Sequence, residues 1–241
     1  GNITATASTT ATIGDMTLNG ATTCTGFTGG LTISRSLLAD KALTTNGALT
    51  VTGTGGASST LKGNITTAGA QSYGGEVTIG GDVTLSTDAA DGTVAFASNV
   101  TINNGAALTF GANASDAYDV TAGGNWTNSG TFSAKKSTVT FTGAGATISG
   151  SQDFAEVTFA GTGITLTGAN TAETATFTAN TTITGDNTYT NFGCTTGGVT
   201  LTFAANTTQT VNGNFNITGE EGSLVTLTGE NAGDSWTIDT S

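Results

Sequence analysis

The side chains that perform most enzyme chemistry are scarce in this chain. Its 241 residues include no histidine, two cysteines and only five lysines and arginines. The absence of histidine excludes Ser-His-Asp and Cys-His catalysis, histidine-based zinc sites and the HExxH motif. No phosphate-binding GxxxxGK[ST] motif is present either. We therefore expect no catalytic residues and predict that the chain is not an enzyme.

Carboxylates are the remaining candidates for chemistry. Glycoside cleavage needs two carboxylates at a defined separation, and calcium needs several oxygen ligands. The acidic clusters are Asp88 with Asp91, Asp116 with Asp119, and Glu220 with Glu221. None has the spacing of an EF-hand loop or of a GGxGxDxUx calcium repeat. We expect solvated turn carboxylates, no metal site and no cofactor, and a polysaccharide-active enzyme is kept only as a second alternative function.

A short repeat predicts the architecture that positions these residues. Val139-Thr-Phe141, Val157-Thr-Phe159 and Ala175-Thr-Phe177 follow one another at a constant interval. In each copy two apolar residues flank a threonine, which is the alternation of a strand with one buried face. Because an interval of about 18 residues is too short for the helix-pair repeats of about 33 to 47 residues, the repeat predicts an all-β parallel β-solenoid.

The apolar-Thr-apolar pattern recurs along nearly the whole chain and predicts one solenoid domain over residues 1–241, with about a dozen coils. Asn104-Gly105 and Asn212-Gly213 provide turns between the expected strands. Since Asn-Gly is also the usual signal of a two-residue hairpin, an antiparallel β-sandwich is the structural alternative. The early coils are expected to be irregular, with an inserted loop near residues 34–46.

Composition supports the solenoid and limits its partners. The chain has no proline, although ordinary usage would supply about a dozen. In a solenoid almost every backbone N–H donates to a neighbouring coil, so proline is costly nearly everywhere. The net charge of −12 disfavours nucleic acid and anionic lipid. No apolar run is long enough for a membrane span, so membrane insertion is not expected.

Stacking of coils predicts two rows of identical residues. In-register coils place like above like, so Phe141, Phe159 and Phe177 are expected to form an aromatic stack in the core. The intervening threonines, which are Thr140, Thr158 and Thr176, are expected to form an outward ladder on the opposite face of the same sheet.

The two cysteines allow two interpretations. Cys24 and Cys194 would be separated by about nine coils, or roughly 40 Å along the axis, whereas a disulfide tolerates a Cα separation of about 7 Å. They are therefore not expected to pair within one molecule. Either both are small buried core residues, or Cys24 of one subunit forms an intermolecular disulfide with Cys194 of the next.

Two stretches resemble repeats of large bacterial surface proteins. Residues 65–102 read ITTAGAQSYGGEVTIGGDVTLSTDAADGTVAFASNVTI and resemble repeats of filamentous-haemagglutinin-like exoproteins. Residues 201–241 read LTFAANTTQTVNGNFNITGEEGSLVTLTGENAGDSWTIDTS and resemble a recurring unit of very large bacterial surface proteins. The resemblance implies a right-handed parallel β-helix, exported to the cell surface or the extracellular matrix, with an adhesive or scaffolding role.

These observations predict a structural or adhesive extracellular protein of a bacterium, either a subunit or a segment of a surface fibre. The chain begins at Gly1 without an initiator methionine, so we expect a processed form or part of a longer protein. The strand Trp236–Ile238 is expected to form an uncapped assembly end, because unpaired terminal strands invite another chain to add. The expected partner is a second copy in a head-to-tail filament, and surface glycans of a host or neighbouring cell are a candidate ligand.

Ice binding is the alternative function. Flat threonine arrays on β-solenoids are the geometry associated with antifreeze proteins, which this chain resembles only in the expected ladder of Thr140, Thr158 and Thr176. Threonine is also a favourable solvent-facing residue in any strand. A measurement of thermal hysteresis separates the two explanations.

Overall fold

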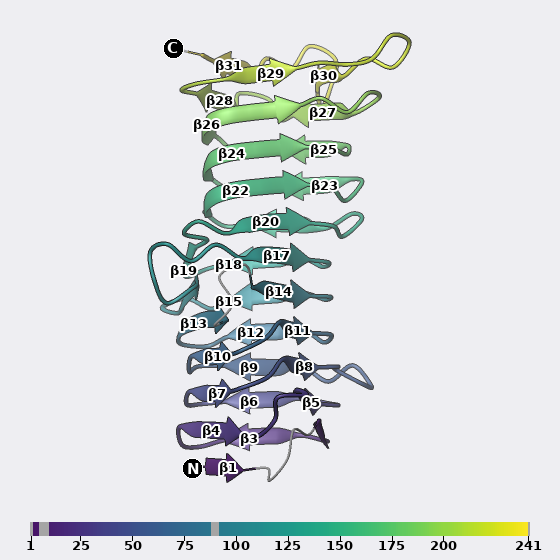
Figure 1. Cartoon of the computed structure of the whole chain (residues 1–241). Coiled ribbons are helices and arrows are strands. Elements are labelled where there is room, and N and C mark those ends of the chain that lie inside the picture. Colours follow the sequence, from purple (N-terminus) through teal and green to yellow (C-terminus); the bar gives the residue numbers. More distant parts are fainter. Residues whose placement is uncertain (1, 5–9, 88–91, 241) are drawn as a thin grey trace.

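The computed structural model describes residues 2–4, 10–87 and 92–240, which form a column of stacked strands without a helix among them (Figure 1). The chain passes repeatedly through three sheets and builds a parallel β-solenoid of about 10 turns. All pairs of the named strands are parallel. The parallel solenoid predicted from the short central repeat is therefore confirmed, and the antiparallel sandwich is wrong.

Each sheet runs along the column, and we number the sheets by the order in which the chain first enters them. The first sheet contains, in order, β1 (Asn2–Thr4), β4 (Thr22–Thr25), β7 (Leu43–Thr45), β10 (Ile65–Thr67), β13 (Asp82–Thr87), β16 (Ala107–Phe110) and β19 (Thr131–Ser133). The second contains β2 (Ala11–Ile13), β5 (Leu31–Ile33), β8 (Leu49–Val51), β11 (Gln71–Tyr73), β14 (Thr93–Phe96), β17 (Asp119–Ala122), β20 (Thr138–Phe141), β22 (Asp153–Phe159), β24 (Thr171–Phe177), β26 (Asn187–Cys194), β28 (Thr208–Val211) and β31 (Thr237–Asp239), and β29 (Phe215–Ile217) also pairs with β26. The third contains β3 (Met16–Leu18), β6 (Leu37–Ala39), β9 (Ser59–Leu61), β12 (Val77–Ile79), β15 (Val100–Ile102), β18 (Trp126–Asn128), β21 (Thr147–Ser149), β23 (Ile164–Leu166), β25 (Thr181–Ile183), β27 (Thr200–Phe203) and β30 (Thr226–Gly229).

The later coils are simpler than the early ones. The first sheet ends at β19, and β22, β24 and β26 are each seven or eight residues long. A hydrogen bond of 3.1 Å from the Ala134 N–H to the Asp153 carbonyl joins the region of β19 to the start of β22. Further along, the first half of β26 pairs with β28 and its second half with β29.

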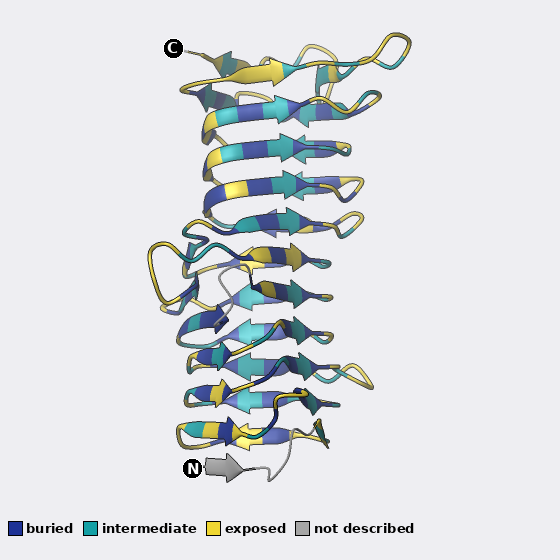
Figure 2. Ribbon diagram, viewed as in Figure 1, coloured by how far each residue is buried: buried dark blue, intermediate teal, exposed yellow. Residues whose placement is uncertain are grey.

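The core is a single continuous column of apolar side chains. Buried residues alternate with partly exposed ones along most strands (Figure 2), as expected for a strand with one buried face. The buried cluster runs from Met16 to Val211. The turn at Asn104-Gly105 leads from β15 to β16 on the next face, with Gly105 at a φ of 77°. It is therefore a corner of the coil and not a hairpin.

The structure has fewer turns than the dozen expected, because the early coils are longer than the central repeat. In the early part, Gln71 lies in register with Val94 of the next coil. In the later part, Val157 lies in register with Ala175, which follows it after a shorter stretch of chain. The length of the central repeat therefore underestimates the residues used by most early coils, although Leu31 and Leu49 are in register at the interval of the central repeat.

The loop expected near residues 34–46 is absent, and that expectation was wrong. The segment contains β6 and β7, whose inward residues Leu37, Ala39 and Leu43 are fully buried. Of the adjacent Leu37 and Leu38, only Leu37 points into the core, while Leu38 is half-buried in the outward row. No helix in the described part of the chain is long and apolar enough to cross a membrane.

Candidate functional surfaces

The interior of the later coils is an aromatic column. The Phe141 and Phe159 rings stack with centroids 5.8 Å apart and planes 9° apart. The Phe159 and Phe177 rings stack at 4.8 Å and 18°. All three side chains are buried, so their place in the core leaves no aromatic platform for a ligand at these positions.

Both cysteines lie inside the column as free thiols. Cys24 is 1% exposed and Cys194 is fully buried. Burial raises the pKa of both thiols, which suppresses the reactive thiolate. Cys194 is in register with Ile217 of the last coil, so a link to another subunit would require that coil to open. The geometry matches the interpretation of small core residues.

A ladder of buried amides runs along one corner of the column and was not foreseen. Its members are Gln152, Asn170, Asn187 and Gln209, all buried. The Asn170 Nδ2 donates to the Asn187 Oδ1 at 2.7 Å, and the Asn187 Nδ2 donates to the Gln209 Oε1 at 2.9 Å. The ladder continues downwards, since the Trp126 Nε1 and the Asn128 Nδ2 each donate to the Gln152 Oε1 at 3.2 Å.

The sequence carries a signal for this ladder. Each of the last three amides stands two residues before an inward apolar residue: Asn170 before Ala172 of β24, Asn187 before Tyr189 within β26, and Gln209 before Val211 within β28. The spacing follows the coil, because Asn187 and Gln209 lie in register. The period of two that turns Ala172, Tyr189 and Val211 inward also turns these amides inward, but Asn and Gln are ordinarily exposed, so their residue type conceals the signal.

The predicted threonine ladder occupies the second sheet. Thr140 is in register with Thr158, and Thr158 with Thr176. The row continues to Thr121 on one side and is interrupted by Gly193 on the other. An adjacent row in the same sheet carries carboxylates, since Asp119 pairs with Thr138 and Thr138 with Glu156. The face is thus threonine-rich but also acidic.

A second threonine row, which was not predicted, lies on the third sheet. The in-register residues are Thr147, Thr165, Thr182, Thr202 and Thr228. Thr167 lies two residues after Thr165, and Thr184 lies two residues after Thr182. The Thr167 N–H donates to the Ile148 carbonyl, and the Thr184 N–H donates to the Leu166 carbonyl, each in the coil below. The apolar-Thr-apolar pattern at Ile164–Leu166 predicts an outward threonine at Thr165. It does not show which of the three sheets contains this strand, because that depends on the register between coils.

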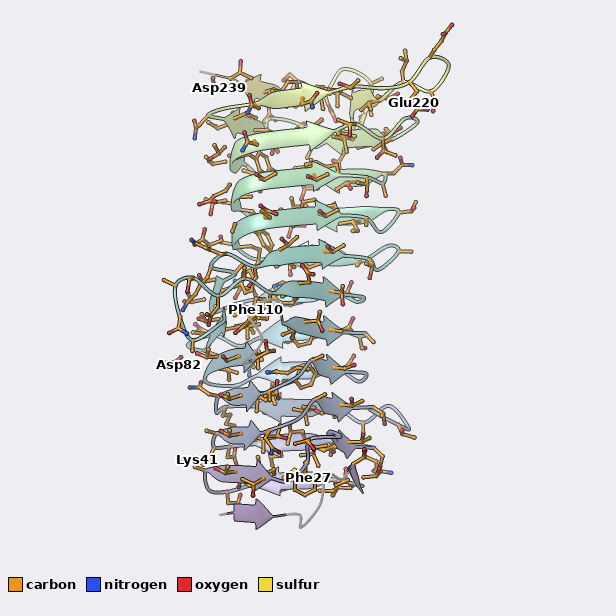
Figure 3. All side chains as sticks on the ribbon, in the orientation of Figure 1. Phe27, Lys41, Asp82, Phe110, Glu220 and Asp239 are labelled. Carbon is orange, nitrogen blue, oxygen red and sulfur yellow. The ribbon has the colours of Figure 1, made fainter. Side chains whose placement is uncertain are left out.

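The predicted carboxylate clusters do not form a metal-binding site in the described part of the chain. Asp88 and Asp91 lie outside the described residues. The Asn113 N–H donates to the Asp116 Oδ2 at 2.8 Å and holds the pKa of that carboxyl below its ordinary value of 3.8. Glu220 lies on a loop beside the last coil (Figure 3). Among residues 2–4, 10–87 and 92–240, no three His, Cys, Asp or Glu side chains gather as a metal site would require.

The carboxyl-terminal end of the column is incompletely covered. Each of β29, β30 and β31 pairs with a strand of the coil below, and no further described strand pairs with its other edge. Phe215 is 37% exposed and Leu224 70% exposed. Ile217, Leu227, Trp236 and Ile238 are only partly buried against the core. One coil below, the residues in register with Phe215 and Ile217, which are Phe192 and Cys194, are buried.

Comparisons with known proteins give no relative from which a function could be transferred. No family model, no curated protein and no solved structure matched this chain.

Proposed function

We propose that this chain is a structural and adhesive extracellular protein of a bacterium, a subunit or segment of a surface fibre whose rods join end to end. The proposal rests on the structure of the last coil. Within the described chain, β29, β30 and β31 each have one unpaired edge, and apolar side chains of this coil are partly exposed. Open strand edges are templates for pairing with another chain. A head-to-tail contact of this kind repeats without closing and generates a filament.

The proposed occupant of this end is the first coil of a second copy. The second and third sheets run to the last coil and their strands pair in parallel there, so an added coil would extend these two hydrogen-bond ladders in the direction they already follow. It would also cover Ile217, Leu227, Trp236 and Ile238, as the coils below are covered. Burial of these side chains and pairing of the edges both favour association.

The test compares a charge at the end with a charge in the middle of the rod. Ile238→Lys places an ammonium group at the proposed contact, and Thr101→Lys places the same group outward on β15. In sedimentation velocity, we expect the wild type and Thr101→Lys to form concentration-dependent oligomers and Ile238→Lys to stay monomeric. Circular dichroism checks that both variants are folded. A wild-type protein that is monomeric at every concentration would overturn the proposal.

The resemblance to filamentous-haemagglutinin-like exoproteins supports the location that we propose. The resembling stretch at residues 65–102 runs from β10 to β15 and supplies two strands to each of the three sheets. It is therefore a whole structural unit of the solenoid. The right-handed coil and the export to the cell surface that the resemblance implies are part of the proposal. Surface labelling of intact cells with an antibody against the chain tests the location.

Ice binding is the second candidate, and one observation favours it. The row from Thr147 to Thr228 on the third sheet repeats at the inter-strand spacing of about 4.8 Å and contains no carboxylate. The row on the second sheet is less suitable, because carboxylates lie beside it. Thermal hysteresis that is lost in Thr182→Lys would support this candidate, and its absence in the wild type would remove it.

A further inference from the structure

A glycine interrupts the threonine ladder of the second sheet without any steric need for glycine. Gly193 lies in β26, in register with Thr176 below and Asn216 above. A Cβ built at Gly193 would meet only the Ala175 carbonyl oxygen, at 3.9 Å, and its φ is not in the left-handed region. Glycine in a strand costs conformational entropy and often marks a close approach by another molecule. The fold itself therefore does not explain this glycine.

A shallow hollow of about 270 Å³ lies on the surface at Gly193. The hollow is lined by Thr174, Thr176, Asn191, Phe192, Gly193, Asn214 and Asn216. It lies across β24, β26 and β29, and Figure 1 shows where these three strands lie near the carboxyl-terminal end of the column. Its volume is slightly below the roughly 300–1,000 Å³ of pockets for drug-sized ligands, which suits one ring of a larger ligand.

The lining offers hydrogen-bonding groups and no charge. The Asn214 Nδ2 donates to the Asn191 Oδ1 at 2.9 Å, and the Thr218 Oγ1 donates to the Asn216 Oδ1 at 3.0 Å. These bonds orient both amides. Within the described chain, no protein group bonds to the Asn214 Oδ1 or the Asn216 Nδ2, which leaves one carbonyl acceptor and one amide group with two N–H donors among the lining residues.

We propose that the Gly193 hollow binds one ring of a neutral saccharide. Vicinal hydroxyls both donate and accept hydrogen bonds, as the free amide groups require. An anionic glycan is disfavoured, because the net charge is −12 and no basic residue lines the hollow. At Gly193 itself a peptide strand has no edge to pair with, since β26 is already paired with β24 on one side and with β28 and β29 on the other.

This inference rests on the adhesive part of the proposed function and gives it a site. Its test fills the hollow without disturbing the fold. Gly193→Thr restores the threonine row, and the open space at the Cβ predicts a melting temperature equal to or above that of the wild type. Ala95→Thr is the matched control, because Ala95 is in register with Thr121 in the same row, several coils away. Both variants add a threonine side chain to the same outward row.

The probe is a glycan array that carries neutral hexose and N-acetylhexosamine oligosaccharides beside uronic-acid and sulfated ones. The neutral oligosaccharide that binds most strongly on the array is then titrated into the protein by isothermal calorimetry. We expect Gly193→Thr to weaken its binding at least tenfold, while Ala95→Thr binds like the wild type. No neutral binding, binding of anionic glycans only, or equal binding by Gly193→Thr would each overturn the proposal.

The failure of this inference is separable from the failure of end-to-end assembly. Gly193→Thr is expected to sediment like the wild type, and Ile238→Lys is expected to bind the neutral oligosaccharide normally. If the glycan fails to bind while the rods still associate, only the saccharide site is wrong. If Gly193→Thr changes sedimentation without any glycan binding, the hollow is a contact between copies and not a saccharide site.

Discussion

Truncation of one amide in the buried ladder is the most informative perturbation of this fold. In Asn170→Ala, the Gln152 N–H loses its acceptor, the Asn170 Oδ1 at 3.1 Å. The Asn187 Oδ1 loses the 2.7 Å bond from the Asn170 Nδ2. The Thr167 carbonyl loses a bond of 3.2 Å from the same amide. All of this occurs at a position that is 3% exposed, where water cannot easily take the place of the lost amide.

The expected loss of stability follows from these contacts. An orphaned buried N–H costs about 1–3 kcal/mol, and a lost hydrogen bond whose partner keeps another bond costs about 0.5–1.5 kcal/mol. We expect the free energy of unfolding to fall by about 2–4 kcal/mol. Asn180→Ala is the matched control, because the Asn180 Oδ1 accepts from the Thr200 N–H at 2.8 Å in an exposed turn. There water replaces the amide, and we expect a loss below about 1 kcal/mol.

Urea unfolding and amide hydrogen exchange measure this difference. Exchange is needed beside the urea midpoint, because a column of coils can open locally without global unfolding. A local loss of about 2 kcal/mol corresponds to roughly 30-fold faster exchange of the Gln152 N–H. Equal midpoints for the two variants, together with unchanged exchange at Gln152, would show that the amide ladder does not stabilise the column as we argue.

Three further predictions concern the interior. Phe159→Ala removes the middle ring of the stack and should lower the free energy of unfolding by about 3–5 kcal/mol in urea denaturation; a loss below about 1 kcal/mol would place the ring outside the core. Cys24 and Cys194 should not react with a thiol reagent at pH 8 until urea is added, because burial raises both pKa values; rapid labelling of the native protein would contradict their burial. Burial also raises the pKa of the Tyr73 and Tyr189 phenols, because the folded protein favours their neutral forms. The contribution of these neutral phenols to the free energy of unfolding is therefore complete below about pH 10, where an unfolded tyrosine is also neutral. It decreases as the pH rises further. Their phenolate absorbance should therefore appear together with loss of the β-sheet circular dichroism, and its appearance in a folded protein would refute the prediction.

The sequence by itself determined the class of fold. Threonine between two apolar residues, repeated from Val139 to Phe177, requires strands with one buried face. A repeat this short leaves room for strands and turns but not for a helix pair. The same regularity correctly placed Phe141, Phe159 and Phe177 above one another, because stacking in register needs only equal spacing. The length of the early coils and the segment 34–46 were misjudged, because their spacing departs from that repeat.

Only the tertiary structure decided which residues share a surface. A coil has three faces, and the number of turn residues between them cannot be counted from the sequence, so the face of Thr182 or Thr202 could not be known. The amide ladder through Asn170 follows the alternation of buried and exposed residues, since Asn187 and Gln209 occupy inward positions of β26 and β28, but the hydrogen bonds that satisfy these side chains come from neighbouring coils and depend on the register. The hollow at Gly193 is visible only because the register sets that glycine between Thr176 and Asn216. Register is a long-range property, fixed by hydrogen bonds between coils, and no local pattern of residues encodes it completely.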